Sequence, residues 1–189
     1  MHKRSHILGL VGTARSGKDS LYLALKDAGV GVARLAFADN VKRELAQACG
    51  VSVPFINYYK ERFRPALQWW GTDFRRWNAG EDYWIRQAEH ILGAICKTLQ
   101  PDLVIFTDTR FINEADWIRC HGGQLWRVTR PRTFRQWAGG LFRRAHRSET
   151  ELRRIRCDRE IRNAGTLKDL RASALSAWSE WKAPAHHSI

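Results

Sequence analysis

The sequence has few of the features that mark disulfide-linked, zinc-binding or membrane-spanning proteins. Its 189 residues include only four cysteines, at positions 49, 96, 120 and 157, and none belongs to a CxxC pair. A zinc site or redox pair is therefore not expected, and reduced thiols are the default. No apolar run approaches the roughly 18 residues that span a bilayer. The apolar run at 7–12 is too short for a signal-peptide core, so we expect a cytoplasmic protein with no membrane partner.

Residues 127–162 contain no lysine, although the chain as a whole is strongly basic. Its 32 Lys and Arg outnumber 19 Asp and Glu, which gives a net charge of +13. Residues 127–162 hold twelve arginines and four acidic residues, and so contribute +8 of that charge. Guanidinium groups favour bidentate contact with phosphate oxygens, which makes this stretch a candidate phosphate-binding segment. A solvated helical face with internal ion pairs is the alternative.

Apolar strands alternate with helical segments along the chain. Strands are expected at 7–12, 32–37, 103–107, 124–129 and 160–162. Helices are expected at 17–28, 39–49, 113–121 and 166–181, and the aromatic-rich stretch 54–98 is expected to be mainly helical. This order predicts an α/β fold, a three-layer sandwich with a mostly parallel central sheet. Ligands of such sheets bind beyond the carboxyl ends of the strands.

The turn after the first expected strand has the sequence of a phosphate-binding loop. Residues 12–18 match the pattern GxxxxGK between a strand and a helix, the context that this motif requires. Glycines let several backbone N–H groups converge on one anion, and the helix that follows adds its positive dipole end. We therefore predict an ATP-binding loop in which Lys18 reaches the outer phosphates; an ordinary strand-to-helix turn is the alternative. The candidate ATP-binding residues are Gly12, Ala14, Arg15, Ser16, Gly17, Lys18, Asp19 and Ser20.

Three residues are candidates for contact with Mg²⁺. Asp19 stands where this motif usually has a Ser or Thr that binds the ion, and Ser20 follows it. Either Ser20 supplies a hydroxyl, or Asp19 acts directly or through water, or Asp19 only favours the helix start. Asp108 follows the most hydrophobic strand and is a candidate for a second carboxylate that orients Mg²⁺ through water. A helix cap or loop acid is the alternative for Asp108.

Six stretches, in order along the chain, resemble the phage-type deoxynucleoside monophosphate kinases, which have the P-loop nucleoside monophosphate kinase fold. They are Ala-Arg-Ser-Gly-Lys-Asp at 14–19, Phe-Ala-Asp at 37–39, Leu-Gln-Trp-Trp-Gly-Thr-Asp at 67–73, Asp-Thr-Arg-Phe-Ile-Asn-Glu at 108–114, His-Arg-Ser-Glu at 146–149 and Asn-Ala-Gly-Thr at 163–166. The resemblance implies one kinase domain over 1–189, a helical acceptor-binding region at 54–98 and an Arg-rich lid at 130–148. It implies transfer of the γ-phosphoryl of ATP to a (deoxy)nucleoside monophosphate, with ATP and Mg²⁺ as cofactors. Related enzymes are often homodimers.

The resemblance also assigns acceptor-binding residues. Gln68 and Thr72 share a helix face, where an amide and a hydroxyl could read a base edge. Trp69 could stack on the base, although most Trp residues in such a stripe belong to the core. Arg110 either touches phosphate or pairs with Glu114, four residues further on. The acceptor-binding candidates are Asp39, which could instead cap a helix, with Arg64, Gln68, Trp69, Thr72 and Arg110.

The expected lid and the last strand supply the remaining candidates. Lys18, Asp108 and Arg130 are the catalytic candidates, and Arg132, Arg135, Arg143, Arg144 and Arg147 are the other lid arginines. Asn163, Gly165 and Thr166 follow the last expected strand, where this fold places adenine; a helix cap is the alternative for Thr166.

The expected chemistry needs no general base, because an acceptor phosphate oxygen is already ionised near neutral pH. Positioning and charge neutralisation should therefore dominate catalysis. Two other functions compete with this one. One is a kinase of another small phosphate acceptor, such as dephospho-coenzyme A. The other is a nucleotide-regulated nucleic-acid-binding protein, although no groove-reading motif is present and no specific nucleic-acid partner is expected.

Overall fold

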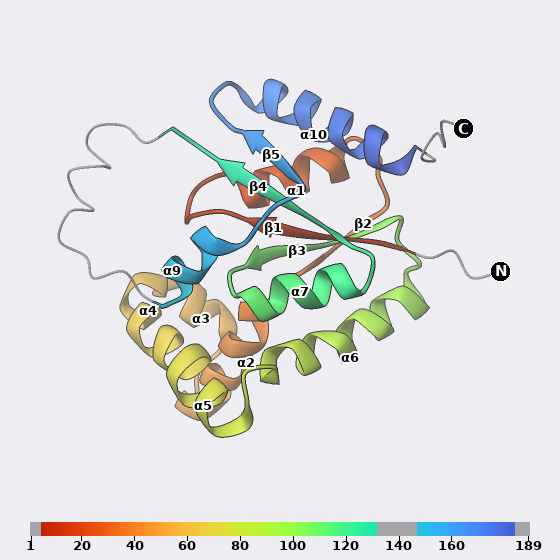
Figure 1. Ribbon diagram of the computed structural model, residues 1–189. Coiled ribbons are helices and arrows are strands. Elements are labelled where there is room, and N and C mark those ends of the chain that lie inside the picture. The colour runs from red at the N-terminus through yellow and green to blue at the C-terminus, as the bar shows by residue number, and fades with distance from the viewer. Residues whose placement is uncertain (1–4, 132–146, 184–189) are drawn as a thin grey trace.

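A five-stranded parallel sheet forms the centre of the computed structural model, which describes residues 5–131 and 147–183 (Figure 1). The strands are β1 (His6–Val11), β2 (Val32–Leu35), β3 (Leu103–Thr109), β4 (Gln124–Thr129) and β5 (Arg159–Arg162). They lie in the order β2-β3-β1-β4-β5, and every neighbouring pair is parallel. The predicted α/β class is confirmed, and this sheet is entirely rather than mostly parallel.

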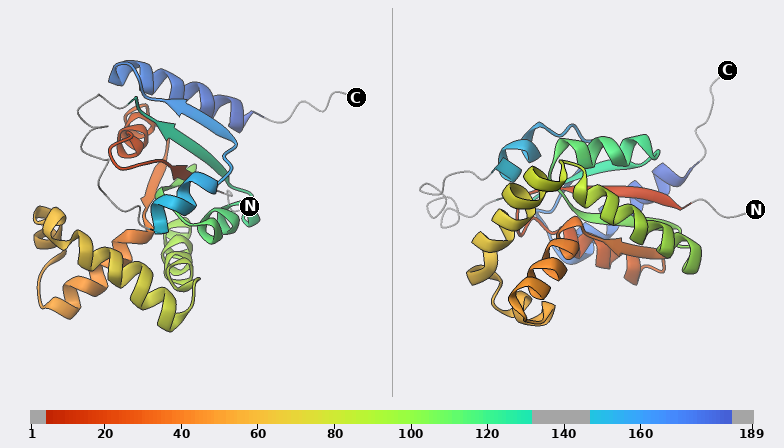
Figure 2. Two further views of the ribbon diagram at one scale, coloured as in Figure 1. Left: turned by 60° about the vertical axis from the view of Figure 1, so that its left-hand side comes forward. Right: turned by 90° about the horizontal axis from the view of Figure 1, so that it is seen from below.

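Helices cover both faces of the sheet (Figures 1 and 2). One face carries α1 (Lys18–Asp27) and α10 (Leu167–Lys182), and the other carries α2 (Phe37–Cys49), α6 (Tyr83–Thr98) and α7 (Ile112–Cys120). Successive strand residues point to opposite faces. In β1, Leu8 and Leu10 therefore pack against α1 and α10, whereas Ile7 and Val11 pack on the other side. The three-layer arrangement follows from this alternation.

A block of short helices connects α2 to α6. It comprises α3 (Val53–Tyr58), α4 (Lys60–Gln68), the π-helical segment η1 (Trp69–Phe74) and α5 (Arg75–Ala79). In Figure 1 this block lies toward the carboxyl ends of the strands. Part of it packs on a small core around Leu45, Ala46 and Ile56, and Leu67 and Trp70 connect this core to the core beneath α2 and α6.

The start of α2 differs from the prediction. The strand expected at 32–37 ends at Leu35, and α2 begins at Phe37, so Asp39 lies inside the first turn and does not cap the helix. The cap comes from another strand: Asp108, in β3, accepts hydrogen bonds from the backbone N–H groups of Phe37 (2.9 Å) and Ala38 (2.8 Å). A side chain distant in sequence thus satisfies the first N–H groups of α2, and the helix begins earlier than local sequence indicates.

Helix α9 (Arg147–Arg154) contains the last of the expected lid arginines. Arg132, Arg135, Arg143 and Arg144 lie outside the described residues. Within residues 5–131 and 147–183, no helix combines the length and the apolar character needed to cross a membrane. The four cysteines are free thiols.

Candidate active site

The loop between β1 and α1 is shaped by its backbone. Gly17, immediately before α1, has φ +106°, and Arg15 is also left-handed, with φ +63°. Such a run of left-handed residues turns successive N–H groups toward a common point, as in anion-binding nests. The Lys18 ammonium lies beneath this turn and donates hydrogen bonds of 2.8 Å to the carbonyls of both Gly12 and Thr13. The loop is therefore closed around its own lysine.

Asn163, immediately after β5, braces the loop from the same edge of the sheet. Its side-chain amide donates to the Ser16 carbonyl (3.0 Å), and its backbone N–H donates to the Thr129 carbonyl (2.7 Å). The amide lies so close to Gly17 that a Cβ there would be 2.2 Å from Asn163 Nδ2. Gly17 is thus required by both its φ angle and its neighbour.

Thr166 is the N-cap of α10. Its hydroxyl accepts the N–H of Asp169, and the Asp169 carboxylate accepts the N–H of Thr166 in return. This confirms the cap alternative for Thr166 and describes a capping box. Gly165 precedes the cap.

Burial lowers the pKa of Lys18 to about 8, and the charge of Arg110 contributes in the same direction. Asp19 and Asp108 oppose this shift. A buried ammonium group with a lowered pKa is short of negative charge around it. Phosphate groups bound at the loop would supply that charge.

A cavity of about 560 Å³ opens beside the loop. Its wall comes from the loop and α1, the end of β2 and start of α2, the α4–η1 segment, and the turn between β3 and α7. Ten of the predicted site residues line it: Ala14, Arg15, Lys18, Asp19, Asp39, Arg64, Gln68, Thr72, Asp108 and Arg110. Residues from loops and helices far apart in sequence therefore meet at one site.

Other predicted residues lie elsewhere. Gly12, Ser16 and Gly17 form the loop behind the cavity, and Ser20 lies in α1, away from the cavity wall. Trp69 is half-exposed and stacks on Phe74 outside the cavity, at 5.1 Å between ring centroids.

The two expected lid arginines within the described residues also lie outside the cavity wall. Arg130 is exposed after β4. Arg147, in α9, forms ion pairs with Glu81 (3.1 Å) and Glu151 (2.8 Å). Both partners belong to the described residues, so Arg147 is already paired in this structure.

The cavity is rich in cations, and half of them form ion pairs with described residues. Arg34 and Lys42 both contact Asp39, at 2.7 and 3.4 Å. Four further residues of the cavity wall were not identified from the sequence, and they are Arg34, Lys42, Lys60 and Glu61. Two of them had a signal in the sequence: Arg34 lies at a strand end, and Lys42 lies one helical turn after Asp39. Asp39 therefore serves as a partner for two cations of the wall.

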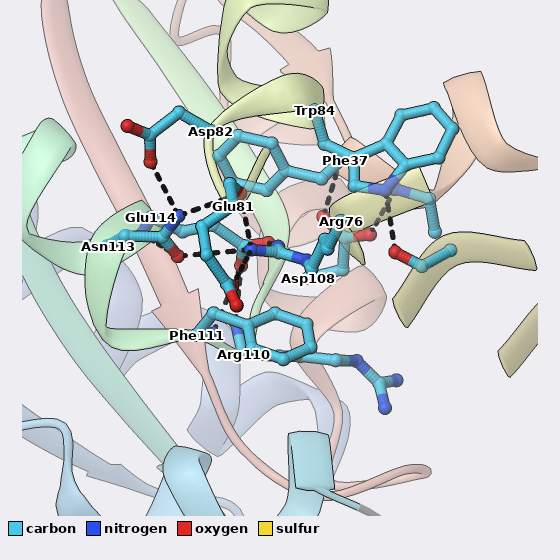
Figure 3. Close-up of polar contacts among 12 residues, drawn as sticks. Phe37, Arg76, Glu81, Asp82, Trp84, Asp108, Arg110, Phe111, Asn113 and Glu114 are labelled. Atoms are coloured by element: carbon cyan, nitrogen blue, oxygen red, sulfur yellow. Dashed lines mark hydrogen bonds and ion pairs between the residues drawn. The ribbon is translucent and has the colours of Figure 1, made fainter. Parts of the chain in front are cut away.

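Arg110 differs from these paired cations. Its guanidinium has no ion-pair or hydrogen-bond partner among the described residues, and Figure 3 shows it pointing away from the neighbouring acidic cluster. The Arg110 guanidinium does not pair with Glu114. Glu114 pairs with Arg76, and its contact with Arg110 is to the backbone N–H (2.8 Å) and not to the side chain.

Asp108 occupies the middle of the site. Burial raises its pKa, while the N–H groups of Ala38 and Phe37 and the charge of Arg110 act against the shift. The cap alternative for Asp108 is thus seen directly, since both carboxylate oxygens accept N–H groups of α2. Each oxygen keeps a further lone pair, so capping and contact with a cavity ligand are compatible.

The π-helical segment η1 brings Thr72 to the cavity wall. Thr72 is buried, and no described residue makes a hydrogen bond to its hydroxyl; Gln68, one turn earlier, also lines the cavity without a partner among the described residues. Trp84 closes the cavity beneath them and donates its indole N–H to the Gly71 carbonyl (2.7 Å), which fixes it as a packing residue. π-Helical turns occur frequently at functional sites.

Comparisons with known proteins agree with this fold. No protein-family model and no curated protein matches the chain. Among solved structures, TT1252 from Thermus thermophilus matches with a TM-score of 0.59 at 18% identity, over 96% of this chain and 100% of the other. A sugar kinase from Janibacter sp. HTCC2649 matches with a TM-score of 0.51 at 16% identity, over 93% of this chain and 95% of the other. At these identities the likeness establishes a shared α/β fold.

Proposed function

We propose that this protein is an ATP-dependent kinase that transfers the γ-phosphoryl group to a (deoxy)nucleoside monophosphate. One observation carries the proposal: a single cavity contains Lys18 of the loop, Arg110, and the polar side chains of Gln68 and Thr72. The side chains of Arg110, Gln68 and Thr72 have no hydrogen-bond or ion-pair partner among the described residues. Lys18 and the loop suit the phosphates of ATP, Arg110 suits a monophosphate, and Gln68 and Thr72 suit a base edge. The shared fold with a sugar kinase supports phosphoryl transfer to a small acceptor.

The reaction is an in-line displacement. A phosphate oxygen of the acceptor forms a bond to the γ-phosphorus of ATP, the bond from that phosphorus to the β–γ bridging oxygen breaks, and ADP leaves. The acceptor oxygen carries no proton near neutral pH, so no side chain has to act as a base. Lys18 and Arg110 line the same cavity, where their positive charges would offset the negative charges of the donor and acceptor phosphates.

The carboxylates of the cavity fit Mg²⁺ held mainly by phosphates. Within the described residues, no three His, Cys, Asp or Glu side chains gather into a complete metal cage. Mg²⁺ in kinases uses one or two carboxylates with phosphate oxygens and water, and Asp19 and Asp108 offer that set on the cavity wall. Ser20 is the further candidate in α1. The ion would neutralise phosphate charge during transfer.

Other parts of the proposal come from the resemblance. Asn163 and Gly165 are placed near adenine, residues 54–98 are assigned to acceptor binding, and the arginines of 130–148 are assigned to a lid. Asn163 supports the first assignment, because it already contacts the phosphate loop. A homodimer is likewise part of the proposal.

The test is an acceptor panel. Purified protein is incubated with ATP, Mg²⁺ and, separately, each of the common deoxynucleoside and nucleoside monophosphates and dephospho-coenzyme A, and ADP is measured. We expect ADP formation with at least one deoxynucleoside monophosphate. Turnover with dephospho-coenzyme A alone would assign the competing acceptor, and no turnover with any acceptor would refute the kinase.

A further inference from the structure

Glu114 is a buried carboxylate whose two oxygens have different partners. Oε1 accepts a hydrogen bond from Arg76 Nη2 at 2.6 Å. Oε2 accepts the backbone N–H of Arg110 at 2.8 Å and that of Phe111 at 3.2 Å. One side chain therefore joins an arginine of α5 to the backbone of the turn between β3 and α7 (Figure 3).

Arg76 lines the cavity, but both terminal nitrogens of its guanidinium are already bonded to protein groups, and only Nε has no partner among the described residues. Its side chain is 1% exposed, and its guanidinium lies 3.7 Å from the centre of the Phe111 ring. Nη1 donates to the Glu81 carbonyl at 2.8 Å and to Asn113 Oδ1 at 3.3 Å, while Nη2 is bonded to Glu114. The cation is thus fixed on several sides and faces the carboxylate of Glu114.

The turn that these two residues hold contains Arg110. Glu114 fixes the backbone of Arg110 and Phe111, whereas the Arg110 side chain lies on the cavity wall without a partner among the described residues. Helix α9 supports the same region from outside, because Glu151 Oε2 accepts the N–H of Ile112 at 3.4 Å. The backbone is therefore held firmly where the side chain is free to meet a ligand.

Stability alone gives little reason for this ion pair. When two ions are buried, the free energy lost with their hydration is about as large as the gain from their attraction. Apolar residues of similar volume often give the folded protein equal or greater stability. A buried pair of this kind is better explained when its geometry serves another group. Here that group is the Arg110 turn.

We propose that Glu114, held by Arg76, is a positioning residue that clamps the Arg110 turn and so fixes the Arg110 guanidinium for the acceptor phosphate. Only the second part of this inference, that the clamp places Arg110 for an acceptor phosphate, rests on the proposed kinase function. The clamp itself, two backbone N–H groups on one buried carboxylate, is a separate claim about the fold. Different measurements test the two claims.

The experiment compares two double variants that carry the same charge. Arg76→Met/Glu114→Gln keeps a side-chain oxygen that accepts the two N–H groups, whereas Arg76→Met/Glu114→Met removes it. Both eliminate the buried ions, so neither leaves an unpaired charge in the core. Arg159→Gln/Glu180→Gln, at a surface ion pair between β5 and α10, is the control for removal of a pair elsewhere. Thermal melting followed by circular dichroism verifies that each variant is folded.

Two readouts decide the outcome. Amide hydrogen exchange at Arg110 and Phe111 should be about tenfold faster in Arg76→Met/Glu114→Met than in Arg76→Met/Glu114→Gln, since the side-chain acceptor of both N–H groups has been lost. The KM for the best acceptor of the panel should rise about tenfold in the same comparison, with little change in the KM for ATP. The control should match the unmodified protein in both.

Specific results would overturn the proposal. Equal exchange in the two double variants would show that Glu114 does not clamp the turn. Faster exchange with an unchanged acceptor KM would show that the clamp does not position Arg110 for the acceptor. If the unmodified protein phosphorylates no acceptor, the kinase fails, and the exchange measurement still decides the clamp.

Discussion

The two halves of the cavity are built in different ways. On the proposed donor side, Lys18 bonds to carbonyls five and six residues away, and the loop is formed mainly by backbone, with Asn163 as a distant brace. On the proposed acceptor side, Asp108 bonds to N–H groups 70 and 71 residues away, and Glu114 to a guanidinium 38 residues away. A local motif therefore encodes most of the first half, while the second half exists only once the chain has folded. Five experiments test this contrast.

The largest expected effect is on folding, from the acceptor side. Arg76→Met leaves the Glu114 carboxylate buried without its cation and should lower the free energy of unfolding by about 3–5 kcal/mol in urea titrations. Arg75→Met is the matched control, because its partner Glu44 keeps hydrogen bonds from Trp70 and Tyr83. Equal losses in the two variants would contradict a special role for the buried pair.

The second effect is on activity, from the donor side. Lys18→Met should reduce kcat/KM by about 10²–10³, as loss of one electrostatic group at a transition state commonly does. It should not reduce stability at pH 7. The folded protein binds the Lys18 proton less tightly than the unfolded chain, with a pKa of about 8 against 10.5, so the charged lysine destabilises the fold below pH 8. A large loss of stability would show that the loop depends on this side chain.

The third effect combines backbone strain with a steric clash. Gly17→Ala places a methyl group 2.2 Å from Asn163 Nδ2 at a φ of +106°, and should cost about 1–3 kcal/mol of stability and weaken ATP binding. Gly50→Ala has a φ of +64° with open space around its Cβ, so it should cost only about 1 kcal/mol and leave ATP binding unchanged. Calorimetric titration with ATP compares the two, and equal ATP affinities would argue against the brace.

The fourth effect concerns acceptor choice. Thr72→Val keeps the shape of the side chain and removes its hydroxyl, so the ratio of kcat/KM between deoxynucleoside monophosphates should change about tenfold. Thr98→Val, which loses a hydroxyl bonded to a helix carbonyl of α6, is the control. An unchanged ratio in the Thr72 variant would remove this residue from base reading.

The smallest effect is a proton count. At pH 8 about half of the free protein carries an uncharged Lys18, so binding of ATP should take up about half a proton, and none at pH 6. Calorimetry in buffers of different ionisation enthalpy measures the uptake. Lys18→Met should abolish it, and Arg110→Met should reduce it, since the Arg110 charge lowers the pKa of Lys18. Uptake that persists in Lys18→Met would assign the proton to another group.

The α/β fold and the turn that forms the loop at 12–18 were predictable from the sequence, for a physical reason. Apolar strands that alternate with helices along the chain predict the parallel sheet, and the spacing of Gly12, Gly17 and Lys18 predicts the loop. Both signals are local in the sequence. The start of α2 and the partner of Glu114 could not be obtained in this way. Asp108 caps a helix that it does not belong to, and Arg76 was one of several arginines on a helical stretch. These contacts require the sheet to bring β3, α5 and α7 together.

The small core around Leu45, Ala46 and Ile56 has a consequence for the evolution of this chain. Mutations in α3 meet this small core, whereas Leu67 of α4 and Trp70 of η1 also pack on the core beneath α2 and α6, so changes at those two positions reach the layers that hold the sheet. The acceptor site of the proposed kinase can therefore be remodelled at other residues of α4 while the loop at 12–18 is inherited intact.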